Sequence, residues 1–343
     1  MEIRQLELSD WNDLLPDRGF DVFHTTEALR VIDRHSPGEL HLFGGFKGEQ
    51  PVGLFPIDVR SKLGGDILTS PPPGLGIGRL GPLIMYSSPK QRTQLRTNKT
   101  FIRGVLDELE GDSQLALVRM SCSPRYRDPR PFRWNGFDIS PAFTYQLDLA
   151  DADTDQLLQS FTRDFRSEIR KQDGVDFSIR RGGMNAARET FESITERIRE
   201  QDYRTPLPWE FVRDLLEELG DRARVYVAEA DGRFLSGMII LYSNDTAYFW
   251  KGGAKTERTV SPNSLLHWRV IEDILTDPEL ASVDQYDLYT ANDDRLAEYK
   301  SKFGGKLSVY YVVESKGLTT TLAKSLYRMS AFGRNPLQAK TQI

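Results

Sequence analysis

The first candidate for chemistry is a lysine in the segment NDDRLAEYKSKFGGKL, residues 292–307. At helical spacing Lys300 falls on the same face as Leu296, Tyr299 and Phe303. A lysine held among apolar side chains can act as a fixed cation that stabilises an anionic transition state or binds a phosphate. The same pattern fits a lysine that extends its ammonium to the edge of a core, so both roles stay open.

Polar residues precede this helix. In YDLYTAND, Asp287 is expected within a strand, with Asn292 and Asp293 at the turn into the helix. Polar groups at strand ends in α/β folds commonly face a ligand crevice. Asn292 and Asp293 are also suitable helix caps, and capping is expected for at least one of them. Tyr299 and Asn292 are the predicted neighbours of Lys300 in a catalytic cleft, with Asp287 as a substrate-binding residue.

Two further segments could hold an anion. Arg163, Arg166 and Arg170 form a basic row on a helix expected over 157–171, which would suit a diphosphate or an RNA backbone. Acidic residues interrupt this row, so a solvated and partly ion-paired face is an equal alternative. The sequence SPNS places Ser261 at the N-cap of another helix, and Asn263 in its first turn. A helix N-terminus is a common anion site.

Composition limits the other possibilities. A length of 343 residues with 39% hydrophobic and 28% charged residues indicates a globular chain of two domains. A net charge of -5 argues against a general nucleic-acid coat, although arginine outnumbers lysine by 32 to 13. The single cysteine, Cys122, excludes an internal disulfide and fits a reducing compartment. Four scattered histidines and the lack of G-x-S-x-G predict neither a metal site nor a serine hydrolase.

The chain shows a duplicated plan. Residues 40–59 and 223–242 both read as β-hairpins of the same register, with turn glycines Gly48 and Gly232. Each hairpin is followed by a loop, a helix, a strand, and then an aromatic residue and glycine before a closing strand. Agreement over five elements indicates two copies of one mixed α/β unit, at residues 1–145 and 146–315. The rest, residues 316–343, is a basic tail.

These residues resemble a known family. The paired hairpin strands, the strand ending YDLYTAN and the segment AEYKSKFGG are similar to the GNAT acyltransferase fold. The duplication, the basic FTRDFRSEIRKQ segment and the FGG ending resemble the Fem-type peptidyltransferases, which have two GNAT-like domains and use aminoacyl-tRNA. The resemblance extends over about residues 20–315 and implies two tandem GNAT-like acyltransferase domains, the second of them catalytic and the first supporting.

The resemblance also implies roles for individual residues. Lys300 matches the lysine of an aromatic-Lys-x-x-Phe-Gly pattern in the acyl-transfer region, and Arg166 and Arg170 match the basic helix. The chain departs from the acyl-CoA enzymes before the helix at Ser261, where AKTERTVSPNS lacks their glycine-rich diphosphate loop. Fem-type relatives also lack this loop.

The expected function is therefore an N-acyltransferase that transfers an acyl or aminoacyl group to an amine on a cell-envelope or sugar precursor. The alternative is a non-catalytic GNAT-like module that binds a nucleotide-sugar or lipid-linked precursor. No permanently bound cofactor is expected, and acyl-CoA or aminoacyl-tRNA would be the co-substrate. The expected partners are a small-molecule or lipid-linked precursor, tRNA, and a membrane surface contacted by the basic tail. The expected state is a cytoplasmic monomer, placed in part at the inner membrane surface.

Overall fold

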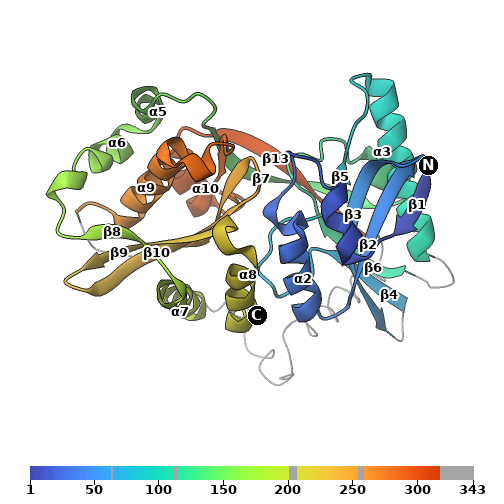
Figure 1. Cartoon of the computed structure of the whole chain (residues 1–343), viewed down its shortest axis with the longest axis horizontal. Helices are drawn as coiled ribbons and strands as arrows, with labels where there is room; N and C mark the ends of the chain where they lie inside the picture. Colours follow the sequence, from blue (N-terminus) through green and yellow to red (C-terminus); the bar gives the residue numbers. More distant parts are fainter. Residues whose placement is uncertain (63–64, 111–114, 201–206, 254–258, 317–343) are drawn as a thin grey trace. The chain divides into compact units, whose positions relative to one another are not determined.

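The computed structural model describes residues 1–62, 65–110, 115–200, 207–253 and 259–316 (Figure 1). They divide into two compact units. The first contains Met1–Pro16, Phe23–Pro141 and the strand residues from Tyr310; the second contains Asp17–Val22 and Ala142–Val309. The predicted limits at 145 and 315 lie near these divisions, but residues 17–22 and 310–315 fall in the other unit. The assignment of residues 1–145 and 146–315 to two GNAT-like domains stays a prediction. The predicted basic tail beyond Lys316 lies outside the described residues.

The first unit is built on a sheet with the strand order β1-β2-β3-β4-β6-β13, and the short β5 pairs with β3. Its strands are β1 (Glu2–Gln5), β2 (Glu39–Lys47), β3 (Gln50–Lys62), β4 (Gly65–Ser70), β5 (Leu83–Ile84) and β6 (Leu115–Ser121). Its helices are α1 (Leu8–Trp11), α2 (Thr26–His35), α3 (Gln91–Glu110) and α4 (Arg130–Trp134).

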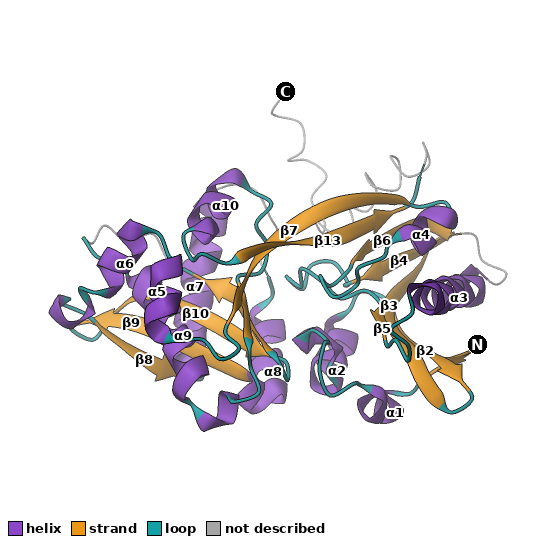
Figure 2. Cartoon of the chain, turned by 90° about the horizontal axis from the view of Figure 1, so that it is seen from above, coloured by secondary structure: helices purple, strands orange, loops and turns teal. Residues whose placement is uncertain are grey.

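Glycines let α3 lie close to this sheet (Figure 2). A Cβ on Gly45 of β2 would lie 2.5 Å from the Phe101 ring, and one on Gly53 of β3 would lie 2.7 Å from it. Phe101 is fully buried and belongs to a core that includes Phe55 and Phe132. The missing side chains therefore allow a phenylalanine of α3 to pack directly on the backbone of two strands.

The second unit has the strand order β7-β12-β11-β10-β9-β8. Its strands are β7 (Asp138–Asp148), β8 (Ser178–Gly182), β9 (Ala223–Ala230), β10 (Arg233–Tyr242), β11 (Thr246–Gly252) and β12 (Gln285–Asp287), and β13 is Lys306–Glu314. Its helices are α5 (Thr154–Ser160), α6 (Arg163–Ile169), α7 (Met184–Glu200), α8 (Trp209–Leu219), α9 (Pro262–Thr276) and α10 (Asp294–Ser301). Helices α7 and α9 pack on opposite faces of β9 and β10 (Figure 1).

The strands of the two units share one pairing pattern. From β1 to β13 the successive pairs are antiparallel three times, then parallel, then antiparallel. From β8 to β7 the same sequence of pairings recurs. The prediction of two tandem mixed α/β units with one plan is thus confirmed. Both hairpins are confirmed too, but Gly48 is the first residue of its two-residue turn and Gly232 is the second.

The closing strands differ from the prediction. Each half was expected to close with its own strand. Instead, β12 of the second half pairs with β7, the strand that was expected to close the first half. Strand β6 of the first half pairs with β13, the strand that was expected to close the second half. The prediction was wrong because alternating apolar residues indicate a strand and its buried face, but they do not identify the partner strand.

The predicted helix 157–171 is two helices. Helix α5 ends at Ser160 and α6 begins at Arg163, because Phe161 and Thr162 are extended. The Thr162 amide donates to the carbonyl of Lys302, which holds the chain out of helical geometry at this point. The apolar spacing continues across the break, and Phe161, Phe165 and Ile169 are all buried. Among the described helices, none has the length and apolar character needed to cross a bilayer.

Candidate functional site

Lys300 is buried in the second unit, with 5% of its surface exposed. Its Nζ donates hydrogen bonds to the backbone carbonyls of Leu288 and Thr290, at 2.5 and 2.7 Å. The ammonium also lies 5.5 Å from the ring centroid of Phe249 on β11, at a distance where a cation and an aromatic face attract each other. The alternative in which Lys300 extends into solvent is therefore wrong, since the helix directs the ammonium into the protein.

Helix α10 is placed by local signals at both ends. The Asp293 carboxylate accepts a hydrogen bond from the Leu296 amide at 3.2 Å, so the expected cap is confirmed at this residue. After the helix, Gly304 adopts a φ of +64°. Phe303 is fully buried, but Leu296 is 37% exposed, so the predicted apolar face holds only near the C-terminal end of the helix.

Aromatic rings surround the lysine. The His267 ring on α9 lies 4.6 Å from the Phe249 ring and 4.6 Å from that of Phe303. His267 Nδ1 lies 2.7 Å from the Tyr286 hydroxyl, and burial, followed by the charge of Lys300, lowers the pKa of His267 to about 3. Burial also raises the pKa of Tyr299. A neutral imidazole and a protonated phenol therefore lie beside Lys300.

Asp287 and Asn292 tie the segment before α10 to β7. The fully buried Asp287 carboxylate accepts from Thr144 Oγ1 at 2.6 Å and from Gln146 Nε2 at 3.0 Å. The Asn292 side-chain oxygen accepts from the Phe143 amide at 2.7 Å. Asp287 is the last residue of β12, as expected. Both side chains thus fix the chain that carries the two carbonyls bound by Lys300.

The basic row lies on a neighbouring helix. Arg163 and Arg170 are exposed, and Arg166 is half-buried and donates to the carbonyl of Gln159 at 2.8 Å. Within the described parts of the chain, no carboxylate lies within ion-pair distance of these three guanidiniums. Helix α6 approaches α10 through Phe165, whose ring centroid lies 4.4 Å from that of Phe303. The helix that carries the basic row therefore packs beside the segment that follows Lys300, and the joint role of the row and Lys300 stays a prediction.

A second cationic group lies by the start of α9. Ser261 is at its N-cap position but forms no capping side-chain hydrogen bond, and the Asn263 side-chain oxygen accepts from Ser236 Oγ at 2.6 Å. Arg197, at the end of α7, donates to the carbonyl of Gly253 at 2.7 Å. Burial, and then the positive charge of Arg295, lowers the pKa of Arg197. Two guanidiniums thus share one electrostatic environment.

Sequence reasoning missed several of these residues. His267 was set aside because the histidines show no metal spacing, although its place among the apolar residues of SLLHWRVIEDIL is a signal for burial. Arg197, Arg295 and the carbonyl of Thr290 carry no local motif. No group of three metal-ligating side chains occurs in the described residues. Burial raises the pKa of Cys122, so this thiol is not activated as a nucleophile.

The arrangement fits acyl transfer with little covalent catalysis. It offers a buried lysine in an apolar surrounding, and guanidiniums on α6 and α7. Such groups can hold an activated donor and stabilise the negative charge of a tetrahedral intermediate.

Comparison with known proteins bears on the fold. A search of curated protein sequences found no significant match. Among solved structures, FemX matches with a TM-score of 0.67 and 12% identity over 95% of this chain and 100% of its own. The C-terminal domain of a putative lysylphosphatidylglycerol synthetase from Agrobacterium fabrum matches with a TM-score of 0.58 and 11% identity, over 94% of this chain and 96% of its own.

A third structure, a tandem GNAT protein from the clavulanic acid biosynthesis pathway, matches with a TM-score of 0.51 and 13% identity over 92% of this chain and 99% of its own. The family model described as the acetyltransferase (GNAT) domain matches residues 159–301, which extend from the end of α5 to the end of α10 and contain every residue of the basic row and Lys300. The chain therefore has the fold of tandem GNAT proteins, and its residues 159–301 match the GNAT domain model.

Proposed function

We propose that the protein is an N-acyltransferase that moves an activated acyl or aminoacyl group to an amine on a cell-envelope or sugar precursor. The observation that carries this proposal is the buried ammonium of Lys300, fixed by two backbone carbonyls at the point where β12 ends. A cation held in this way needs no reorganisation when negative charge develops nearby. The similarity to FemX and to a putative lysylphosphatidylglycerol synthetase supports an aminoacyl donor and an envelope or lipid-linked acceptor.

The reaction would proceed by direct attack. The neutral amine of the acceptor attacks the acyl carbon, and the carbonyl oxygen gains the negative charge that Lys300 would stabilise. The C–S bond of a thioester or the C–O bond of an aminoacyl ester then breaks. The leaving thiol or hydroxyl takes up the proton that the amine loses. Tyr299 and Asn292 would border the cleft.

The donor is expected to be anionic. Arg197 and Arg295 lie within electrostatic reach of each other, and no carboxylate of the described residues is within ion-pair distance of either. Like charges at one place favour a bound anion, such as the phosphates of acyl-CoA or of a tRNA acceptor end. Ser261 and Asn263 at the start of α9, and Arg163, Arg166 and Arg170 on α6, would add to this binding. Replacing Arg197 or Arg295 by Gln should therefore raise the donor KM more than it lowers kcat.

The test is a transfer assay with acyl-CoA and aminoacyl-tRNA donors and a panel of amine acceptors, in which rates are expressed per folded molecule. Lys300→Met should reduce kcat by about a hundredfold or more, the scale seen when one transition-state donor is removed. Lys300→Arg should keep part of the rate, because it retains the charge. Lys306→Met, which removes an exposed lysine, is the matched control. An unchanged rate in folded Lys300→Met would exclude this role.

One observation favours the alternative of a non-catalytic binding module. Lys300 already bonds to two carbonyls, which is a sufficient structural role, whereas Arg163 and Arg170 are exposed. In that case a nucleotide-sugar or lipid-linked precursor should raise the Tm without any turnover. Arg163→Gln with Arg170→Gln should abolish the rise, while acyl-CoA and aminoacyl-tRNA should have no effect.

The cytoplasmic location, contact with the inner membrane surface and a monomeric state remain part of this proposal. Gradient flotation with anionic vesicles would test the membrane contact, and light scattering would test the monomer.

A further inference from the structure

A row of cations follows the outer face of α3 in the first unit. Four basic residues recur at spacings of four, three and four positions, so they share one face of this helix. They are Arg92, Arg96, Lys99 and Arg103, and all four are exposed. The fully buried Phe101 packs on the sheet from the opposite face of α3, so the row is directed away from the core. With a rise of about 1.5 Å per residue, the α3 row is about 16 Å long.

Most of the charge in the α3 row is not neutralised by the described residues. Arg103 Nε lies 3.6 Å from a carboxylate oxygen of Asp107. In the part of the chain that the structure describes, no carboxylate lies within ion-pair distance of Arg92, Arg96 or Lys99. Like charges in one line raise the local positive potential, which attracts an extended anionic partner.

An exposed tryptophan of α4 lies beside the α3 row. Helices α3 and α4 are in contact (Figure 2), and Trp134, the last residue of α4, is 51% exposed. The ammonium of Lys99 lies 5.8 Å from the centroid of its ring, and the guanidinium of Arg130 lies 5.6 Å from it. Arg130 also pairs with Asp128 at 2.7 Å. A large apolar ring is therefore exposed in basic surroundings.

Tyr86 is a second exposed aromatic residue in this part of the first unit. It is 40% exposed, and burial, followed by the charge of Asp128, raises its pKa. Its hydroxyl thus lies within electrostatic reach of the carboxylate that Arg130 binds. Tryptophan and tyrosine are enriched where a bilayer meets water, because their rings are apolar and also carry a polar group. Lysine and arginine at the same depth are attracted to anionic lipids.

The cations over the Trp134 ring favour a lipid surface over a nucleic acid. A single strand of nucleic acid binds by stacking its bases on open aromatic rings. A base on Trp134 would have to displace the charged groups of Lys99 and Arg130 from the ring surface that they cover. A lipid headgroup layer needs no such stack, since the ring can enter the layer while both cations stay beside it.

We propose that the α3 row and Trp134 dock the protein on an anionic lipid bilayer. Arg92, Arg96 and Lys99 contact lipid phosphates, and Trp134 enters the interface between headgroups and acyl chains. This inference rests on the membrane contact of the proposed function, and it assigns the main part of that contact to the first unit. It does not depend on acyl transfer, because binding to lipid needs neither donor nor acceptor.

The test is flotation of the full-length protein with two kinds of vesicle, one of phosphatidylcholine and one of phosphatidylcholine with an equal amount of phosphatidylglycerol. The parent protein should bind the mixed vesicles, bind them more weakly at high salt, and leave the neutral vesicles unbound. Combining Arg92→Gln, Arg96→Gln and Lys99→Gln should weaken binding by about a hundredfold, since each charge near an anionic surface contributes about fivefold.

Trp134 allows insertion to be measured directly. The other four tryptophans of the chain are buried or half-buried. Bromine-labelled acyl chains quench the fluorescence of a tryptophan that lies among them, so mixed vesicles with this label should quench the parent protein. Trp134→Phe should remove the quenching and bind within about fivefold of the parent, because phenylalanine keeps an apolar ring. Quenching that persists in this variant, or is missing in the bound parent, would contradict the insertion of Trp134.

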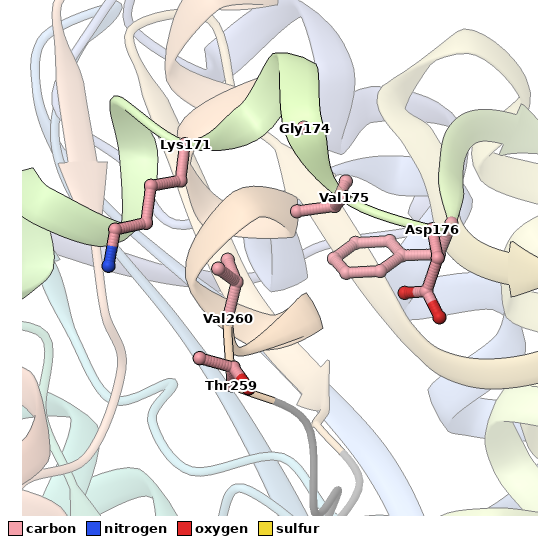
Figure 3. A pocket seen from close by; sticks show the side chains of 7 residues that line it. Lys171, Gly174, Val175, Asp176, Thr259 and Val260 are labelled. Carbon is pink, nitrogen blue, oxygen red and sulfur yellow. The ribbon is translucent and has the colours of Figure 1, made fainter.

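A charge-matched control neutralises three exposed cations of the second unit. It combines Lys171→Gln, Arg199→Gln and Arg233→Gln, and Lys171 borders the pocket shown in Figure 3. This control should bind the mixed vesicles like the parent protein. Circular dichroism spectra of all variants should match that of the parent, so that a loss of binding is not a loss of folding.

A second charge-matched variant separates the α3 row from the basic tail. It combines Lys324→Gln, Arg328→Gln and Arg334→Gln, and it should lose less affinity than the α3 variant. The proposal fails if the parent does not bind mixed vesicles, if the α3 variant and the second-unit control bind alike, or if the tail variant loses more affinity. Binding of tRNA that the α3 variant loses, without binding of vesicles, would also overturn it, in favour of a nucleic acid.

Discussion

The Nζ of Lys300 lies 2.7 Å from the carbonyl oxygen of Thr290, so one side chain closes the segment between β12 and α10 onto the helix. Tyr289, which lies between the two bound carbonyls, has a φ of +70°, so the segment turns at this residue. The carbonyls of Leu288 and Thr290 thus find their donor in a buried side chain.

We expect Lys300→Met to lower the free energy of unfolding by about 2–4 kcal/mol, because it leaves one buried and one partly buried carbonyl without this donor. Urea unfolding followed by circular dichroism measures this change, and Lys306→Met serves as the exposed control. Equal stability of the two variants would contradict the structural role of the lysine.

His267 should make stability depend on pH. Burial, and then the charge of Lys300, lowers the pKa of His267 from its ordinary value of 6.5 to about 3. Between pH 6.5 and 3, His267 is therefore protonated in the unfolded chain but neutral in the folded protein. Stability is complete above pH 6.5 and falls as the pH drops toward 3, by about 2 kcal/mol at pH 5.

Urea titrations at pH 7, 6 and 5 check this expectation. His267→Gln should flatten the slope over that range, since glutamine does not titrate and its amide can still bond to Tyr286. The same slope in the variant and the parent would assign the pH dependence to other groups.

Arg224 should contribute strongly to the stability of the second unit. Its side chain is 2% exposed, with Nη1 2.7 Å from Asp277 and Nη2 2.9 Å from Glu279. We expect Arg224→Met to cost about 2–4 kcal/mol, because breaking a buried ion pair removes hydrogen bonds that burial makes necessary. Glu279 is 71% exposed, and Glu279→Gln should change stability by less than about 1 kcal/mol. Thermal unfolding of both variants compares the two; a larger loss for Glu279→Gln would refute this ranking.

Gly304 should not tolerate a side chain. Its φ is +64°, and a Cβ would lie 2.4 Å from the backbone oxygen of Ser160. Gly304→Ala should therefore cost about 2 kcal/mol or more, through backbone strain and displacement of the end of α5. Gly183→Ala is the control, since its Cβ would meet nothing within 4 Å. Urea midpoints that shift equally for both variants would show that the close approach is tolerated.

Much of the fold could be predicted because it depends on local signals. Alternating strands, turn glycines and caps are short-range features, and they correctly indicated two copies of one unit. The helix predicted over 157–171 was wrong at Phe161 and Thr162, where a hydrogen bond to Lys302 decides the backbone conformation. That partner is 140 positions away in the sequence, and no local pattern contains it.

The candidate site was predictable in part for the same reason. Helical spacing predicted that Lys300 lies on the apolar face of its helix, but it left open whether the ammonium reaches the edge of the core. Its partners are backbone carbonyls, whose direction depends on the turn at Tyr289, and that turn has no residue signature. Asp287 and Asn292 were expected to face a ligand, and the described contacts of both include β7. Whether they also contact a substrate stays a prediction.

The pairing of β6 with β13 affects when the first unit can complete its folding during synthesis. The edge of β6 is completed by Val312–Glu314, which leave the ribosome after nearly all of the second unit. Until these residues are synthesised, the edge of β6 is unpaired and the core of the first unit lacks Val313. A ribosome-bound chain halted at residue 145 lacks this strand and should therefore remain a target for chaperones and proteases.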